Sequence, residues 1–180
     1  MNINFTFDQN LHEVPDAPQE FKAYLFKKVS ELETIEDPFG RASHLSQIGA
    51  LFRIIRRLDE AESFLKEADT LIQKHEMGRV VWVINRLRLA HVLQWKKVFE
   101  VSTEMFQEIL EVCESDANTT EQLDFAWQHL GKNYFDQGIY DLALKAFQTA
   151  LKIRQEKKAA PDLIRSSETA IAETKKRLRL

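Results

Sequence analysis

Five histidines and one cysteine are the side chains most able to do chemistry, and they form no catalytic or metal-binding pattern. The dipeptide His-Glu begins at His12 and at His75, but no second histidine follows at the helical spacing of a zinc-protease site. With five glycines in all, the chain has neither a glycine-rich phosphate loop nor a glycine-flanked serine elbow. The sequence therefore predicts a non-enzyme that uses no cofactor and no metal.

Cys113 is the only cysteine, so it has no partner for an internal disulfide. Its neighbours in "EVCES" are acidic, which raises the pKa of a thiol and lowers its reactivity. We expect Cys113 to be a structural thiol.

Charge is unevenly distributed, although the net charge of −3 is ordinary and gives no global reason to expect nucleic acid. Residues 41–57 hold four arginines and no acid, and residues 79–99 hold five basic residues and no acid. Residues 100–124 carry eight acids and no base. If the basic stretches share one face, that face would favour an acidic peptide or carboxylate.

The charged stretches are predicted to lie on helices. The chain is rich in good helix formers and poor in glycine and proline. Apolar residues recur at spacings of three and four between the turn signals. Residues 3–7, "INFTF", alternate instead and predict an extended arm. The N-terminus does not resemble a secretory signal, and no stretch approaches the ~20 apolar residues of a membrane span, so we expect a cytoplasmic protein without a membrane segment.

An internal repeat organises the helices. Gly49, Ala90 and Gly131 each follow a leucine or isoleucine and are equally spaced along the chain, which gives a 41-residue period. Twelve residues after each comes another small residue, at Ala61, Ser102 and Ala143. Small residues let two helices approach closely, so the unit is predicted to be a helical hairpin that must stack on its neighbours.

The third unit resembles the tetratricopeptide repeat family. The matching residues are Trp127, Leu130, Gly131, Tyr134, Gly138, Tyr140, Ala143, Phe147 and Ala150. The first unit matches moderately but has Arg56 in place of the turn glycine, and the second is degenerate. The period is longer than the repeat usual in this family and looks like that of kinesin light chains and of bacterial regulators.

This resemblance implies an all-α, right-handed α-solenoid of about three hairpins, with an added N-terminal helix and a C-terminal capping helix. The expected segments are an arm at 1–17 and one helical domain at 18–180, divided into 18–38, 42–78, 79–117, 119–158 and 161–180.

In this family the first helix of each hairpin lines a concave face that binds partners. The resemblance therefore implies a non-catalytic module that binds a protein or peptide segment, with an acidic one favoured by the charge pattern. The groove-facing candidates are Arg53, His91, Gln94, Trp95, Gln128, Lys132 and Phe135. For Trp95, a place in the groove wall and a place in the core are both open.

Several alternatives remain open at this stage. The basic stretches can be solvated helix flanks with no ligand. The acidic N-terminal arm can lie in the basic groove and occlude it, or serve in self-association as a homo-oligomer. A regulatory domain for an acidic ligand is another alternative. Nucleic-acid binding is disfavoured, although residues 152–180 carry nine basic residues against four acids.

Overall fold

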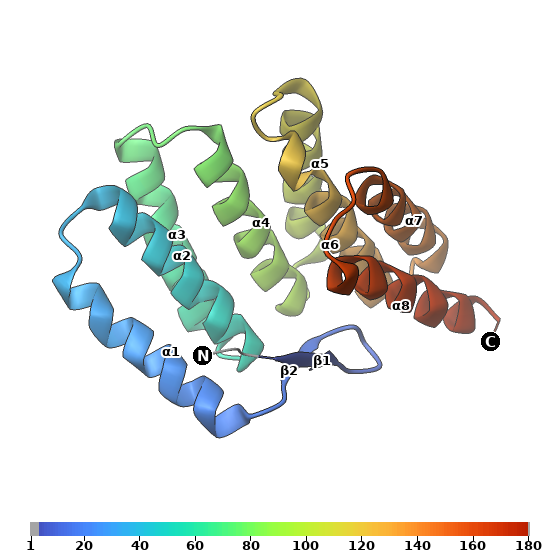
Figure 1. Ribbon diagram of the computed structural model, residues 1–180, viewed down its shortest axis with the longest axis horizontal. Coiled ribbons are helices and arrows are strands. Elements are labelled where there is room, and N and C mark those ends of the chain that lie inside the picture. The colour runs from blue at the N-terminus through green and yellow to red at the C-terminus, as the bar shows by residue number, and fades with distance from the viewer. Residues whose placement is uncertain (1–3, 180) are drawn as a thin grey trace. The chain divides into compact units, whose positions relative to one another are not determined.

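The protein is described here from a computed structural model, which defines residues 4–179. Its elements in chain order are β1 (Phe5–Phe7), β2 (Glu13–Pro15), α1 (Pro18–Glu31), the short 3-10 helix η1 (Leu32–Thr34), α2 (Pro38–Ile54), α3 (Leu58–Lys74), α4 (Arg79–Trp95), α5 (Phe99–Ser115), the short 3-10 helix η2 (Thr120–Gln122), α6 (Leu123–Asp136), α7 (Tyr140–Glu156) and α8 (Pro161–Leu178) (Figure 1). The contacts divide the chain into two compact units, which meet in sequence between Lys97 and Val98.

The helices follow the 41-residue period. Helices α2 and α4 begin at residues 38 and 79, and α3, α5 and α7 begin at residues 58, 99 and 140. The turn between the helices of each hairpin repeats as well, because Arg56, Lys97 and Gly138 all have a positive φ, of 63°, 62° and 76°. The prediction of a helical repeat fold is thus confirmed, and Arg56 takes the backbone conformation of the turn glycine it replaces.

Proline defines the start of three helices, since Pro18, Pro38 and Pro161 occupy their first positions. At α2 the Asp37 side chain also accepts a hydrogen bond of 2.6 Å from the backbone N–H of Gly40. The first hairpin therefore begins at residue 38 rather than at the expected residue 42, because "DPFG" is a helix start and not a loop.

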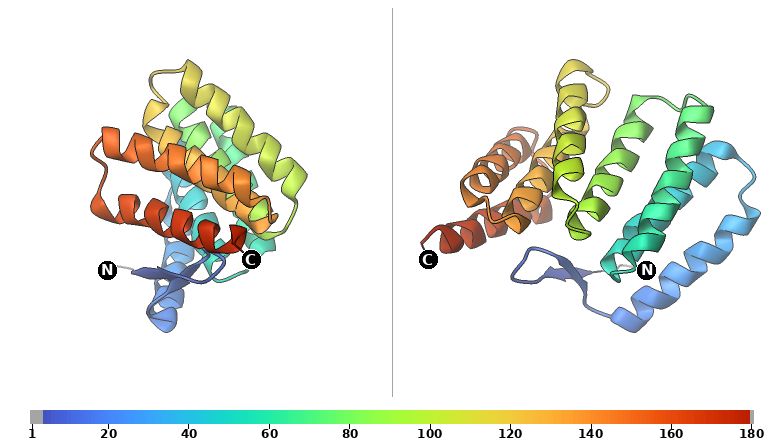
Figure 2. Two further views of the ribbon diagram at one scale, coloured as in Figure 1. Left: turned by 90° about the vertical axis from the view of Figure 1, so that its right-hand side faces the viewer. Right: turned by 180° about the vertical axis from the view of Figure 1, so that it is seen from behind.

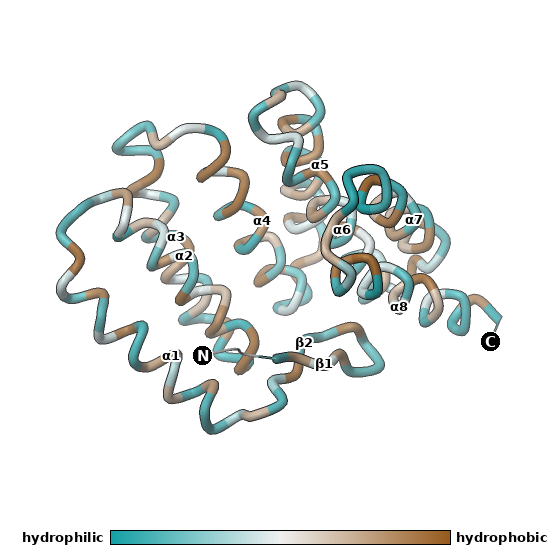
Figure 3. Tube along the Cα trace, viewed as in Figure 1, coloured by the Kyte–Doolittle hydropathy of each residue, from teal (hydrophilic) through white to brown (hydrophobic). Residues whose placement is uncertain are grey.

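The first unit contains β1, β2 and α1 to α4. Helices α2 and α3 form an antiparallel hairpin, α4 packs against both, and α1 lies along α2 (Figures 1 and 2). Each helix of the unit contains both apolar and polar residues (Figure 3), and buried apolar residues form the core. Leu45, Ile48 and Leu65 are completely buried there, and Phe21 and Leu25 of α1 are buried as well.

The N-terminal segment is a two-stranded hairpin and not a simple extended arm. Strands β1 and β2 are antiparallel, with Phe5 opposite Pro15 and Phe7 opposite Glu13. The second strand was missed because its three residues, "EVP", are too few to show an alternating pattern.

The second unit contains α5 to α8. Helices α6 and α7 form its hairpin, α5 packs against α6, and α8 lies along α7 (Figures 1 and 2). Gly131 lies where α6 meets α7, and a Cβ there would come within 2.6 Å of two ring carbons of Phe147. Gly49 is equivalent in the first unit, where a Cβ would lie 2.5 Å from Leu65 Cγ.

Replacing Gly131 with alanine tests this close contact. We expect Gly131→Ala to lower the free energy of unfolding by about 1–3 kcal/mol, because the added methyl group forces Phe147 or the helix to move. Urea denaturation of the purified protein measures the change. In a Phe147→Leu background the same substitution should cost less, and an equal or larger cost there would contradict the proposed clash.

The left-handed turns give a matched pair of substitutions. Lys97→Gly should stabilise the protein by about 1 kcal/mol, because glycine adopts a positive φ without the steric cost of a Cβ. Gly138→Ala should destabilise it for the same reason, and no atom outside the turn lies within 4 Å of the added Cβ. Thermal unfolding followed by circular dichroism would contradict this account if both variants shifted the midpoint in the same direction.

Candidate functional site

The N-terminal hairpin contacts Arg53 and Arg56, which belong to the basic stretch at residues 41–57. Glu13 Oε2 accepts a hydrogen bond of 2.8 Å from Arg53 Nη1, and the side chains of Glu13 and Arg53 are only 15% and 8% exposed. Asp8 Oδ2 lies 3.6 Å from Arg56 Nη2. These two ion pairs connect the turn and second strand of the hairpin to the last turn of α2 and to the turn that follows it.

Trp95, at the end of α4, is at the centre of the same contact. The His12 ring lies against it with centroids 4.4 Å apart, and the Arg53 guanidinium carbon lies 4.5 Å from its centroid. Arg56 lies 5.1 Å from the ring centroid, and the His91 ring meets the indole edge-on at 5.9 Å. A guanidinium over an indole is a favourable cation–π arrangement. Trp95 is therefore a buried wall that the hairpin covers.

The turn between β1 and β2 positions the side chains of His12 and Glu13. Asp8 Oδ1 accepts hydrogen bonds from the backbone N–H of Asn10 at 2.8 Å and of His12 at 3.0 Å. Leu11 has a φ of 62° and is buried. The turn thus places His12 and Glu13 next to one another, one against Trp95 and the other against Arg53.

The seven predicted site residues divide between the two units. Arg53, His91, Gln94 and Trp95 lie in the first unit, Gln128, Lys132 and Phe135 lie in the second, and all seven are buried. The structure brings together Arg53, His91 and Trp95.

In the second unit, α8 contacts the predicted residues. Ser167 Oγ donates a hydrogen bond of 2.8 Å to Gln128 Oε1, and the Arg177 guanidinium lies 5.8 Å from the Phe135 ring centroid. The C-terminal helix therefore shields Gln128 and Phe135.

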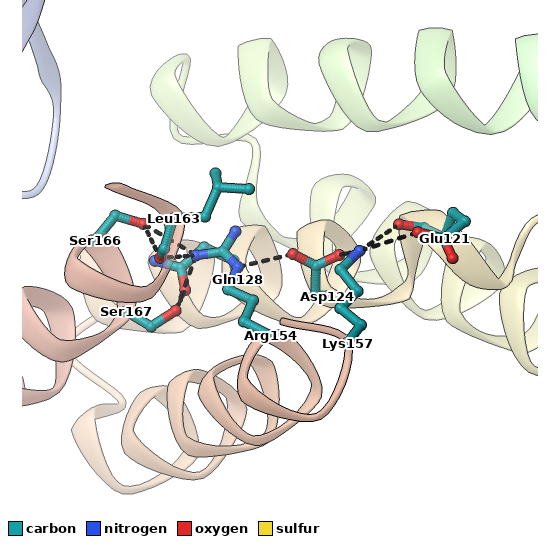
Figure 4. Close-up of polar contacts among 8 residues, drawn as sticks. All are labelled: Glu121, Asp124, Gln128, Arg154, Lys157, Leu163, Ser166 and Ser167. Atoms are coloured by element: carbon teal, nitrogen blue, oxygen red, sulfur yellow. Dashed lines mark hydrogen bonds and ion pairs between the residues drawn. The ribbon is translucent and has the colours of Figure 1, made fainter. Parts of the chain in front are cut away.

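A buried ionic network in the second unit was not anticipated from the sequence (Figure 4). Arg154 Nε of α7 donates to Asp124 Oδ2 of α6 at 2.7 Å, and both side chains are almost fully buried. Arg154 Nη1 also donates to the Leu163 carbonyl and to the hydroxyl groups of Ser166 and Ser167, at 2.8–2.9 Å. One guanidinium thereby connects three helices.

Lys157 completes the network around Asp124. Its Nζ donates to Asp124 Oδ1 at 2.7 Å and to the Glu121 carbonyl at 3.0 Å. The repeat gives the only signal for this network in the sequence. Two 41-residue periods before Asp124 and Arg154, the chain has Ala42 and Ile72. These two residues belong to an apolar cluster in the first unit. A charged pair that replaces an apolar pair in the same register is the pattern that would have revealed it.

No group of three or more metal-binding side chains occurs among residues 4–179. Burial raises the pKa of the Cys113 thiol, with the Glu114 charge as a smaller contribution in the same direction. No helix in this part of the chain is long and apolar enough to cross a membrane.

Removing one partner of the buried pair should be costly. We expect Asp124→Ala to reduce the free energy of unfolding by about 3–5 kcal/mol, because the buried guanidinium of Arg154 loses its counter-charge. The double variant Asp124→Ala, Arg154→Ile reproduces the apolar residues of the first unit and should be more stable than the single variant. Urea denaturation compares the two, and a double variant less stable than Asp124→Ala would overturn this expectation.

Comparison with known proteins agrees with the fold. The tetratricopeptide repeat family model matches residues 124–156, which span α6 and α7. No curated protein matches the chain.

Among solved structures, PlcR of Bacillus thuringiensis, crystallised with the peptide PapR7 and DNA, is similar with a TM-score of 0.76 and 16% identity over 89% of this chain. BtubC (BKLC) from P. vanneervenii is similar with a TM-score of 0.67 and 19% identity over 91% of this chain. The chain spans 58% of the length of PlcR and 65% of that of BtubC. The protein is therefore a helical repeat protein that carries a tetratricopeptide repeat at residues 124–156.

Proposed function

We propose that the protein is a non-catalytic module that binds an acidic protein or peptide segment on the surface formed by Arg53, Arg56 and Trp95. One observation carries this proposal: the chain's own acidic N-terminal hairpin is held there, with Glu13 paired to Arg53 at 2.8 Å. A surface that already binds one carboxylate-bearing segment has the chemistry to bind another.

The contacts of the hairpin define what a ligand must present. Arg53 requires a carboxylate, which a guanidinium binds through charge-assisted hydrogen bonds. Trp95 requires a flat or cationic group in place of the His12 ring, which now lies 4.4 Å from it. The proposed ligand is therefore an extended segment with an acidic residue next to a ring-bearing one.

The same contacts make the hairpin an internal competitor. Because it is covalently attached, it acts at an effective concentration in the millimolar range, so an outside segment must bind better or the hairpin must first be displaced. Exchanging one carboxylate for another at Arg53 avoids leaving a buried charge unpaired, which keeps the exchange energetically feasible.

The comparison with PlcR supports binding of a peptide by this fold, since PlcR was crystallised with one. Self-association is the second candidate, because a hairpin that leaves its own unit can bind the same residues of a second copy.

Weakening the contact between the N-terminal hairpin and Arg53 in the full chain tests the proposal. The probe is a fluorescent peptide with the sequence of residues 4–17, whose binding is measured by fluorescence anisotropy. We expect Glu13→Lys to bind the probe at least about 10-fold more tightly than the unmodified chain, because the lost ion pair frees Arg53.

Asp16→Lys is the matched control, because it makes the same charge change on the same arm at an exposed position, and it should leave affinity unchanged. Adding Arg53→Glu to Glu13→Lys should abolish the gain. Equal affinity in Glu13→Lys and the unmodified chain would contradict the proposal. A dimer of Glu13→Lys in sedimentation, without probe binding, would favour self-association.

A further inference from the structure

We infer that the first unit has a second binding site, for a small carboxylic acid with an apolar body. The site is a cavity of about 390 Å³ between α2 and α4, bordered by Ile72 of α3. Phe39 of α2 and Ile84 of α4 contribute to its mostly apolar wall, and Arg88 and Ser46 supply polar groups. This inference goes beyond the proposed binding of a protein segment and does not depend on it.

Arg88 is the reason to expect an anion. Its Nη1 donates a hydrogen bond of 2.9 Å to Ser46 Oγ, and no carboxylate among residues 4–179 pairs with it. Burial lowers the pKa of Arg88, so its surroundings disfavour the charge that it carries. A cation withdrawn from water is stable only when it is paired and hydrogen-bonded.

Arg53 and Arg154 show how a buried arginine is usually stabilised, which is by an ion pair with a carboxylate. Arg53 is buried against Glu13 and Arg154 against Asp124, with N–O distances of 2.8 and 2.7 Å. Arg88 differs from both because the cavity around it is lined by apolar residues and by the neutral side chains of Ser43, Ser46 and Asn85. A ligand carboxylate would supply the missing partner.

The cavity also limits the size and character of the ligand. Its volume lies at the lower end of the ~300–1,000 Å³ range of small-molecule sites, and its apolar lining suits a hydrocarbon or aromatic body. It lies near the N-terminal half of α2, whereas the hairpin contacts Arg53 near the end of that helix. No residue of the hairpin borders the cavity, so the ligand need not displace it.

Isothermal titration of the full chain with octanoate tests the site. We expect saturable binding of one octanoate per chain, with octan-1-ol and acetate each binding at least about 10-fold more weakly, because the first lacks the carboxylate and the second the apolar body. Arg88→Met should lower octanoate affinity by about 10- to 100-fold. Arg57→Met is the matched control, because Arg57 is paired with Glu60 and does not border the cavity.

Thermal unfolding separates a binding role from a structural one. Without ligand, Arg88→Met should melt at the same temperature as the unmodified chain or higher, since it removes an unpaired charge from partly buried surroundings. Ser43→Phe, at an exposed position on the edge of the cavity, should also reduce binding without loss of fold.

Any one of several results would overturn the inference. These are no difference between octanoate and octan-1-ol, unchanged octanoate affinity in both Arg88→Met and Ser43→Phe, or a lowered melting temperature of ligand-free Arg88→Met. Tighter binding of a short peptide with a C-terminal leucine than of octanoate would likewise overturn it, in favour of a peptide terminus.

Discussion

The structure depends on the close approach of the two helices of each complete hairpin. Gly49 and Gly131 leave no space for a Cβ against Leu65 and Phe147, so the helix axes are as close as the side chain on the partner helix allows. Such close packing accumulates many small dispersion contacts and excludes water from the core. The turns at Arg56, Lys97 and Gly138, which are spaced by the 41-residue period, share one backbone conformation.

The buried arginines Arg154 and Arg53 have different roles in the two units. Arg154 binds three helices of its own unit and is enclosed among carbonyl, hydroxyl and carboxylate groups, so it is a structural group (Figure 4). Arg53 is paired with a residue of the N-terminal hairpin, whose two three-residue strands contain no buried residue. Segments with little buried area open at low free-energy cost. This difference explains why the Arg53 surface is proposed for binding and the Arg154 network is not.

The first unit also shows how one helix pair can offer two kinds of surface. Toward the C-terminal ends of α2 and α4, arginines and Trp95 are matched to a carboxylate and a ring. Nearer their N-terminal halves, the same helices border an apolar cavity with Arg88 in its wall. In α4, "RVVWVINRLRLAHVLQW", Val81 and Ile84 border the cavity, whereas Trp95 at the end of the helix lies against Arg53.

The sequence by itself determined the helices, their 41-residue register and the positions of small residues, because these depend on local propensity and on a spacing that recurs along the chain. The resemblance to the tetratricopeptide repeat family implied that Arg53 and His91 face a groove, and it left Trp95 open between the groove wall and the core. Only the tertiary structure decided that the N-terminal segment is a hairpin on Trp95, that Asp124 pairs with Arg154, and that no carboxylate among residues 4–179 pairs with Arg88. Such pairings join residues that lie far apart in the sequence, and no local pattern specifies which distant charge reaches which partner.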